Sequence, residues 1–385
     1  MYEGSTKHVW RPVEREDRLW FQYDDSYSMF GWRPMPDLIA GRAKSLTVLA
    51  SFFFEHLSDP ISWKQLPVSP ALKSFRSDWL EARWAHLTYS HVLAEHGLPS
   101  HYQGLVAADG TPLTMAEAVG TAGSAYIEVL PAVVTRPEAY TLLGQKVFYY
   151  GPPGPATRRL LPLEVVFHLG IRQKDHLRRR LEADPGYLEA LDIKKIPEDG
   201  QLFDRPLLEF FPRIEPPHRR RLLVQEALVI SGLTGGQFEE LIETAYNIAL
   251  ALYALFSQRR IELWQGKLEF AISAEGLMLV DCLEPDELLI TCNDKRLSKD
   301  AVEMFYRGTP WEAAVQEAKT KAEAMGRRDW QDMCRSALRA EPEPLPSELR
   351  TALDHLYPAL ANHVLRRNLF DGVPPLDDVV TRLPP

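Results

Sequence analysis

A long amphipathic helix followed directly by a β-hairpin is the feature that most constrains the fold of this chain. Across residues 236–259, apolar side chains recur every three or four positions, which predicts a helix with one buried face. Two short strand-like runs follow, 267–270 and 279–281, with turn residues 273–276 between them. A helix with a buried face must pack on another element, so we expect it to cover a sheet that contains this hairpin.

The hairpin carries charges of both signs. Lys267 and Glu269 are two residues apart, so on a strand they point to the same side. Asp281 lies on the returning strand and can face them. A lysine suits a phosphate, and two carboxylates suit a shared magnesium ion. A solvent-exposed ion pair is the more common reason for such a pattern, so the rest of the chain decides between the two interpretations.

Composition excludes several classes of protein. The 385 residues are 45% hydrophobic, which is enough for a large core in two or three lobes. There are 44 basic and 53 acidic residues, and the net charge of -9 argues against a nucleic-acid partner. The basic run 218–221 is either a phosphate contact or, more commonly, a solvent-exposed helix face.

Cysteine usage and hydropathy indicate a reducing compartment. The three cysteines, Cys282, Cys292 and Cys334, form no CxxC pair, so we expect neither a disulfide framework nor a cysteine zinc site. The first residues lack the basic and apolar segments of a signal peptide. No apolar run reaches the roughly 18 residues that a membrane helix needs. We therefore expect a cytoplasmic protein with no membrane partner.

The remaining pattern predicts an α+β fold rather than a parallel doubly wound sheet, because strands occur in both halves with helices between and after them. The sequence lacks a Walker A motif, GxGxxG, HExxH and GxSxG, so P-loop, Rossmann, zinc-protease and α/β-hydrolase functions lose support. Strands are expected at 9–10, 19–21, 126–130, 146–150 and 162–168. Helices are expected at 41–57, 77–96 (ended by Gly97), 301–306, 311–325, 329–338 and 347–368, with a proline-containing break at 59–70 and a linker at 340–346.

Six segments, in the right order, resemble the SAICAR synthetase family, the phosphoribosylaminoimidazole-succinocarboxamide synthases. Each match is weak alone, but six in order over residues 1 to about 310 are hard to reach by chance. The family patterns and the matching residues are LYEGKAKxVY (1–10), SAFDG (28–31), LxEAGIPTHF (93–102), PxEVVVRN (162–169), VDFKLEF (264–270) and DEISPD (281–286).

The resemblance implies a fold and an activity. The fold has a kinase-like antiparallel sheet lobe and an ATP-grasp-like lobe, here with an extra helical segment at the C-terminus. It implies a β-rich ATP-covering lobe with a helical insertion at 1–105, a central α+β lobe at 106–310 and a helical extension at 311–385. In the family, ATP phosphorylates the carboxylate of an aminoimidazole ribonucleotide, and the amine of aspartate then attacks it. This is a C–N ligase of purine biosynthesis that uses ATP and Mg2+.

The resemblance also implies roles for individual residues. It assigns Lys7 and Lys267 to catalysis, and Glu269 and Asp281 to magnesium. The residues implied in ATP binding are Gly4, Ser5, Lys7, Lys267, Glu269 and Asp281. The candidate contacts to the acceptor substrate are Ser28, His168, Arg172 and Lys174.

The acceptor half departs from the family pattern. Ser5 replaces a lysine, Gly31 an aspartate and Cys282 an acid, while His168 and Leu169 replace arginine and asparagine. An arginine that grips a carboxylate or phosphate is not replaced by histidine without changing the ligand.

We therefore expect a ligase with an altered substrate in a nucleoside natural-product pathway. It would act on a small nucleotide-like acid and an amine, aspartate or another, and it could form a homo-oligomer. The alternatives are the standard purine-pathway ligase, a non-catalytic nucleotide-binding homologue and a phosphotransferase.

Overall fold

The computed structural model describes residues 2–3, 7–13, 15–85, 88–151, 157–172, 176–215, 220–327 and 329–384. Two compact units divide the chain. The first consists of residues 1–51, 103–129 and 291–385, and the second of residues 52–102 and 130–290. Helix α1, Arg42–Ser58, runs from the first unit into the second.

The first unit is built on a six-stranded sheet with the order β1-β2-β3-β6-β4-β5. The pairings β1–β2, β2–β3, β3–β6 and β4–β5 are antiparallel. The strands are β1 Tyr2–Glu3, β2 Lys7–Trp10, β3 Leu19–Tyr23, β4 Tyr102–Val106, β5 Pro112–Leu113 and β6 Tyr126–Val129.

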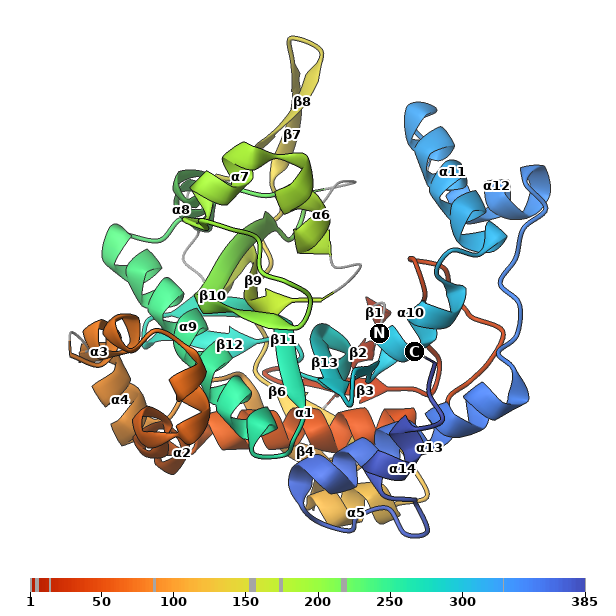
Figure 1. Ribbon diagram of the computed structural model, residues 1–385, viewed down its shortest axis with the longest axis horizontal. Helices are drawn as coiled ribbons and strands as arrows, with labels where there is room; N and C mark the ends of the chain where they lie inside the picture. The colour runs from red at the N-terminus through yellow and green to blue at the C-terminus, as the bar shows by residue number, and fades with distance from the viewer. Residues whose placement is uncertain are drawn as a thin grey trace. The chain divides into compact units, whose positions relative to one another are not determined.

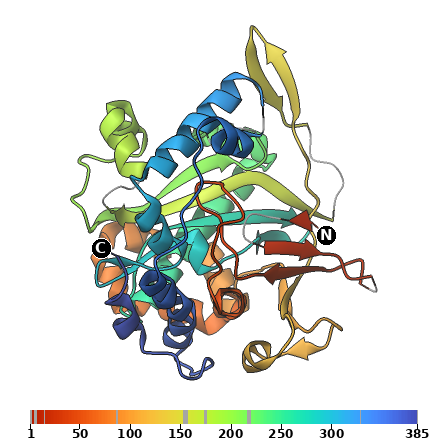
Figure 2. The ribbon, with the colours of Figure 1, turned by 90° about the vertical axis from the view of Figure 1, so that its right-hand side faces the viewer.

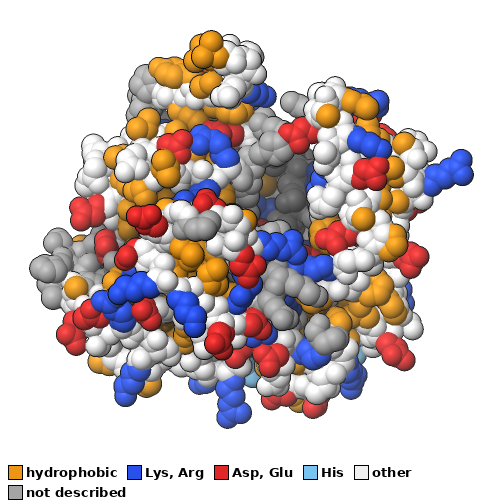
Figure 3. Space-filling view, turned by 45° about the horizontal axis from the view of Figure 1, so that its top comes forward, with side chains coloured by type: hydrophobic (Ala, Val, Ile, Leu, Met, Phe, Trp, Pro, Cys, Tyr) orange, Lys and Arg blue, Asp and Glu red, His pale blue; other side chains and the backbone are white. Residues whose placement is uncertain are grey.

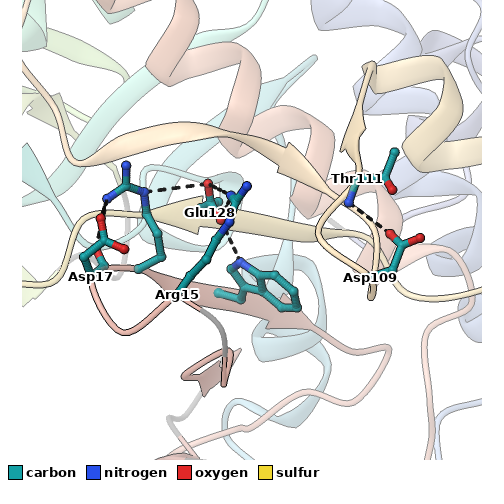
Figure 4. Close-up of polar contacts among 7 residues, drawn as sticks. Arg15, Asp17, Asp109, Thr111 and Glu128 are labelled. Carbon is teal, nitrogen blue, oxygen red and sulfur yellow. Dashed lines mark hydrogen bonds and ion pairs between the residues drawn. The ribbon is translucent and has the colours of Figure 1, made fainter.

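One buried carboxylate of this sheet is fully engaged by its neighbours. Arg15 donates to both carboxylate oxygens of Glu128 at 3.0 and 2.9 Å, as Figure 4 shows. Trp20, which lies opposite Glu128 on β3, donates its indole N–H at 3.0 Å. The contacts satisfy a charge that would be costly to bury alone, so this part of the first unit is a structural network.

Helices complete the first unit. Trp311 and Trp330 pack on Trp32, with ring centroids 5.8 and 5.9 Å away, and so attach two C-terminal helices to the N-terminal loop. The helices are α5 Met115–Gly120, α10 Lys299–Tyr306, α11 Pro310–Ala324, α12 Trp330–Ala337, α13 Ser347–Leu365 and α14 Leu376–Val380, and β14 Lys295–Arg296 pairs with the end of β13.

The second unit contains a sheet with the order β10-β9-β11-β13, and β12 also pairs with β11. The β9–β10, β9–β11 and β11–β12 pairings are antiparallel. The strands are β9 Arg158–Ile171, β10 Gln201–Pro212, β11 Glu262–Ser273, β12 Gly276–Val280 and β13 Leu288–Cys292. A separate hairpin, β7 Glu138–Leu142 with β8 Gln145–Tyr149, stands away from this sheet (Figures 1 and 2).

Helix α9, Gly235–Ser257, covers one face of this sheet (Figure 1). Thr234 caps its N-terminus by accepting a hydrogen bond from the Gln237 backbone N–H at 3.3 Å. Phe238 packs on Phe210 of β10, with ring centroids 5.5 Å apart. The residues of β9, β10 and β11 that share a face with Phe210 therefore point toward α9, and the alternate residues point to the opposite face.

The other elements of the second unit are short. They are α2 Pro60–Gln65, α3 Ser77–Ala85, α4 Thr88–His96, α6 His176–Ala183, α7 Pro185–Ala190, α8 Val224–Ser231, and the 3-10 turns η1 Leu66–Val68, η2 Pro70–Ser74 and η3 Pro285–Glu287.

The α+β class is confirmed, since helices and antiparallel sheets make up both units. Gly97 ends a helix as expected: its φ is +74°, and a Cβ there would lie 1.9 Å from the Ser58 carbonyl oxygen. Two details differ from the prediction. Residues 77–96 form two helices, α3 and α4. The expected break at 59–70 contains helix α2, because Asp59 caps it and Pro60 occupies its first turn, where proline starts a helix rather than stopping one.

No helix among the described residues is both long and apolar enough to cross a membrane. On the face seen in Figure 3, basic and acidic side chains are intermixed.

A half-buried histidine, His56, predicts how stability depends on pH. Burial, together with the charge of Arg259, lowers the pKa of His56 to about 4, although Asp59 opposes the shift. The unfolded chain then binds more protons than the folded one between pH 6.5 and 4, so stability falls as the pH falls through this window. We expect wild type to lose up to about 3 kcal/mol more unfolding free energy than His56→Gln over this range. Urea unfolding at several pH values measures this, and parallel curves would contradict it.

Candidate functional site

The face of the β9–β11 sheet opposite α9 carries a row of charged and polar side chains. Val166 on β9 lies opposite Lys267 on β11 and Glu209 on β10. Glu164, two residues before Val166 on β9, lies opposite Glu269. His168, two residues after Val166, lies opposite Leu207 and Gln265. Residues opposite one another share a face, so this face holds two polar groups of residues beside Val166.

The first group, which we term the lysine–carboxylate cluster, comprises Lys267, Glu269, Glu287, Arg213 and Asp281. Lys267 Nζ lies 3.0 Å from Glu287 Oε2 and 3.4 Å from Glu269 Oε1. Arg213 Nε donates a hydrogen bond to Glu269 Oε2. Glu269 is only 2% exposed, so its carboxylate depends on these two cations rather than on water.

Burial and neighbouring charges shift the pKa values of Glu269 and Lys267. Burial raises the pKa of Glu269, the charge of Asp281 adds to this, and the result is about 8 although Lys267 and Arg213 oppose the shift. Burial alone would lower the pKa of Lys267, but the charges of Glu287, Glu269, Asp281 and Glu164 outweigh it and raise that pKa. The raised pKa of Lys267 means that carboxylates dominate the charge around this ammonium, so the position favours a cation.

The residues present fit a magnesium ion that is shared with a phosphate. Carboxylate oxygens are the hard ligands that magnesium prefers, and Glu269 and Asp281 both contribute to the negative potential of the cluster. In the part of the chain that the structure describes, no three His, Cys, Asp or Glu side chains form a complete metal cage. Magnesium typically takes one or two carboxylates and completes its shell with water and substrate phosphates.

The second group, the Glu209 cluster, comprises Glu209, His168, Arg180 and Arg221. His168 Nε2 and Arg180 Nη2 donate to the same oxygen of Glu209, Oε2, at 2.7 and 2.6 Å. Arg221 Nε lies 3.9 Å from the other oxygen, Oε1. Burial would raise the pKa of Glu209, but the hydrogen bond from His168 and the charges of His168, Arg180 and Arg221 outweigh it and lower that pKa.

Aromatic rings hold the two arginines of this cluster. The guanidinium of Arg221 lies 4.3 Å from the ring centroid of Tyr187, and that of Arg180 lies 5.8 Å from Phe211. Such contacts stabilise a cation at low cost in flexibility. Two guanidinium groups face Glu209, while Asp184 also acts on Arg221, so the Glu209 cluster offers two arginines to an anionic group.

The structure places the predicted nucleotide residues as follows. Lys267, Glu269 and Asp281 come together in the lysine–carboxylate cluster. Lys7 lies on β2 in the first unit, with its Nζ 4.4 Å from the ring centroid of Phe21. Gly4 and Ser5 lie outside the described residues.

The predicted acceptor residues lie in different segments of the chain. His168 is 2% exposed and belongs to the Glu209 cluster. The Arg172 guanidinium lies 5.2 Å from the ring centroid of Trp264, which belongs to the opposite alternation of β11 from Lys267. Ser28 is half-buried in a loop of the first unit. Lys174 lies outside the described residues.

Sequence reasoning missed most partners of these residues. Glu164 was within reach, because it alternates with Val166 and His168 on one strand. The basic run 218–221 does not form a helix face at its described residues: Arg220 and Arg221 lie in irregular backbone, and Arg221 reaches Glu209. No local spacing could reveal the others, which are Arg213, Glu287, Glu209 and Arg180.

Comparisons with known proteins agree on one family. A family model described as SAICAR synthetase matches residues 161–337. An Archaeoglobus fulgidus protein named "Putative phosphoribosylaminoimidazole-succinocarboxamide synthase" is 28% identical over 374 residues, which are 97% of this chain and 95% of that protein. The phosphoribosylaminoimidazole-succinocarboxamide synthase of Chloroflexus aurantiacus is 27% identical over 195 residues, 48% of this chain and 68% of its own length.

Solved structures add the fold. SAICAR synthase from Saccharomyces cerevisiae, complexed with SAICAR, matches with a TM-score of 0.51 at 12% identity, over 94% of this chain and 93% of that one. At this identity the likeness shows that the two chains share a fold.

The lysine–carboxylate cluster predicts a pH-dependent cost for losing its lysine. In Lys267→Met, Glu269 and Glu287 lose the ammonium beside them, so the pKa of Glu269 moves further above that of the unfolded chain. Stability from such a group is present at low pH and lost as the pH rises. We expect Lys267→Met to lower the free energy of unfolding by about 3–5 kcal/mol near pH 8 and by clearly less at pH 5.

Urea unfolding at the two pH values measures this cost, and Lys195→Met, at an exposed lysine of the same unit, is the matched control. An equal loss at both pH values would show that Lys267 does not neutralise the cluster.

Proposed function

Because this chain belongs to the SAICAR synthetase family, whose members are ATP-dependent ligases that form a C–N bond, we propose that it joins a nucleotide-like heterocyclic carboxylate to an amine through an acyl phosphate. The observation that carries this proposal is the buried lysine–carboxylate cluster, whose acids favour a cation and whose lysine suits a phosphate.

The proposed chemistry proceeds in two balanced steps. A carboxylate oxygen of the acceptor attacks the γ-phosphorus of ATP, the bond to the β–γ bridging oxygen breaks, and ADP leaves. The amine nitrogen then attacks the acyl carbon, the C–O bond to phosphate breaks, and phosphate leaves while the nitrogen gives up a proton. The protein mainly has to position the reactants and neutralise charge.

The nucleotide half follows from the first cluster. Glu269 and Asp281 would hold magnesium, which when bound neutralises phosphate charge, and Lys267 would meet the phosphates. Lys7, with Gly4 and Ser5, would cover the phosphates from the lobe at 1–105, and the central lobe at 106–310 would hold the nucleotide. The helical extension at 311–385, whose Trp311 and Trp330 pack on Trp32, could cover or rebuild the acceptor pocket or make a subunit contact. A cytoplasmic setting suits this use of ATP.

The acceptor half is where we propose a change of substrate. His168 stands where the family pattern has an arginine, and its Nε2 is engaged by Glu209. Arg180 and Arg221 instead supply guanidinium groups on this face of the sheet. An anionic group of the acceptor would bind there, with Ser28, Arg172 and Lys174 as further proposed contacts. A specialised nucleoside natural-product pathway would supply such a substrate.

A second candidate is the standard purine-pathway reaction with aspartate as the amine. The near full-length likeness to the Archaeoglobus fulgidus protein favours it, because 95% of that protein is covered without a missing lobe. Under this candidate, Arg180 and Arg221 would serve the usual acceptor in place of the lost arginine.

Mg-ATP affinity distinguishes the proposed role of the lysine–carboxylate cluster from that of the Glu209 cluster. We expect Lys267→Ala and Asp281→Asn to weaken Mg-ATP binding by about 10- to 100-fold, because each removes a group that contacts the phosphates or their metal. Arg180→Leu should leave this affinity unchanged, since the Glu209 cluster lies on the other side of Val166. Isothermal calorimetry on the full chain makes the measurement.

The matched control for Arg180→Leu is Arg178→Leu on the same helix, where the side chain bonds to the Pro197 carbonyl oxygen at 2.9 Å and not to Glu209. Wild-type affinity in both Lys267→Ala and Asp281→Asn would mean that the nucleotide residues are wrongly assigned. A loss confined to Arg180→Leu would place ATP over the Glu209 cluster instead.

A further inference from the structure

Asp281 occupies an unusual backbone position for a residue with a proposed role in metal binding. It directly follows β12 and has a φ of +65°, in the left-handed region that disfavours residues with a Cβ. Its carboxylate acts on Glu269, Lys267 and Arg213. The direction of that carboxylate depends on the backbone conformation, so whatever holds the backbone of Asp281 also aims its side chain.

His101 holds this backbone from a distant part of the sequence. Its Nε2 lies 2.9 Å from the carbonyl oxygen of Asp281. A carbonyl oxygen only accepts hydrogen bonds, so Nε2 must carry the proton and donate. The bond therefore fixes both the ring tautomer of His101 and the orientation of the peptide that follows Asp281.

The backbone around His101 is fixed to β12 as well. The Leu279 N–H donates to the Pro99 carbonyl oxygen at 2.9 Å, and the His101 N–H donates to the Leu279 carbonyl oxygen at 3.0 Å. Residues 99–101 thus run beside the end of β12 as a short parallel bridge. In this register His101 lies beside Val280, one residue before Asp281, and its side chain reaches forward to the Asp281 carbonyl oxygen.

Packing leaves the His101 ring little freedom. The residue is 4% exposed, and its ring centroid lies 5.5 Å from that of Phe54 on α1. The His101 carbonyl oxygen also accepts from the Leu130 N–H at 2.8 Å. Because both its ring and its backbone are held, His101 is a rigid hydrogen-bond donor to the Asp281 carbonyl oxygen.

We propose that His101 is a positioning residue, which aims the Asp281 carboxylate by holding the Asp281 carbonyl oxygen. The inference rests on the proposed function, in which Asp281 binds magnesium together with ATP. It adds a residue that touches neither ATP nor metal, and whose loss changes the magnesium dependence of ATP binding rather than ATP binding in general.

The test compares ATP binding by calorimetry with excess magnesium and with EDTA, on the full chain. His101→Phe keeps an aromatic ring but removes the donor, and it should weaken binding with magnesium by about 10- to 100-fold while binding in EDTA stays within threefold of wild type. His101→Gln places an amide N–H close to the position of Nε2, and it should restore binding with magnesium to within about threefold.

Other results overturn the inference in distinguishable ways. Equal weakening of His101→Phe with magnesium and with EDTA, or failure of His101→Gln to restore binding, would give His101 a structural role only. The magnesium effect is the gain in ATP affinity when EDTA is replaced by excess magnesium. If Asp281→Asn abolishes this effect but His101→Phe preserves it, the inference fails and the proposed function stands. If Asp281→Asn also preserves it, the proposed role of Asp281 fails first.

Folding failure of one variant leaves the test intact. His101→Asn retains an amide donor but is one methylene shorter than His101→Gln, so it cannot reach the Asp281 carbonyl oxygen. A similar magnesium effect in His101→Asn and His101→Gln would overturn the inference. A smaller gain in ATP affinity from magnesium in His101→Asn than in His101→Gln would support the inference.

Discussion

The separation of the two faces of the β9–β11 sheet is the constraint on which the candidate site depends. Helix α9 buries one face, where Phe210 meets Phe238, and this leaves the alternate residues of the same strands for polar contacts. A one-residue slip of register would move Lys267 and Glu269 under α9, where their charges would have no partners. The apolar packing of the helix therefore fixes the position of the charged residues.

On the polar face, two clusters of opposite character lie side by side. The lysine–carboxylate cluster favours a cation, since the charges of Glu287, Glu269 and Asp281 raise the pKa of Lys267 despite its burial. The Glu209 cluster has two guanidinium groups for one carboxylate. The proposed ligase would need both kinds of environment close together, and the register of three strands places the two clusters next to each other.

The sequence predicted the parts of this arrangement that depend on the repeat of side chains along a single helix or strand. Helix α9, the hairpin after it and the shared side of Lys267 and Glu269 follow from spacings of 3.6 and 2 residues. The contact of Arg213 with Glu269 and that of Arg180 with Glu209 depend instead on strand register and on loops far apart in sequence. The register of β9 with its neighbours is a long-range property, so no window of sequence contains it.

Product analysis tests most directly whether the nucleotide half is retained and the acceptor changed. The full chain would be incubated with Mg-ATP and the standard aminoimidazole carboxylate, with and without aspartate, and the products identified by mass. The account predicts clear ATP binding by calorimetry but no aspartate-dependent succinocarboxamide. An aspartate-dependent succinocarboxamide, formed with release of ADP, would contradict it and show that the Glu209 cluster serves the standard purine substrate.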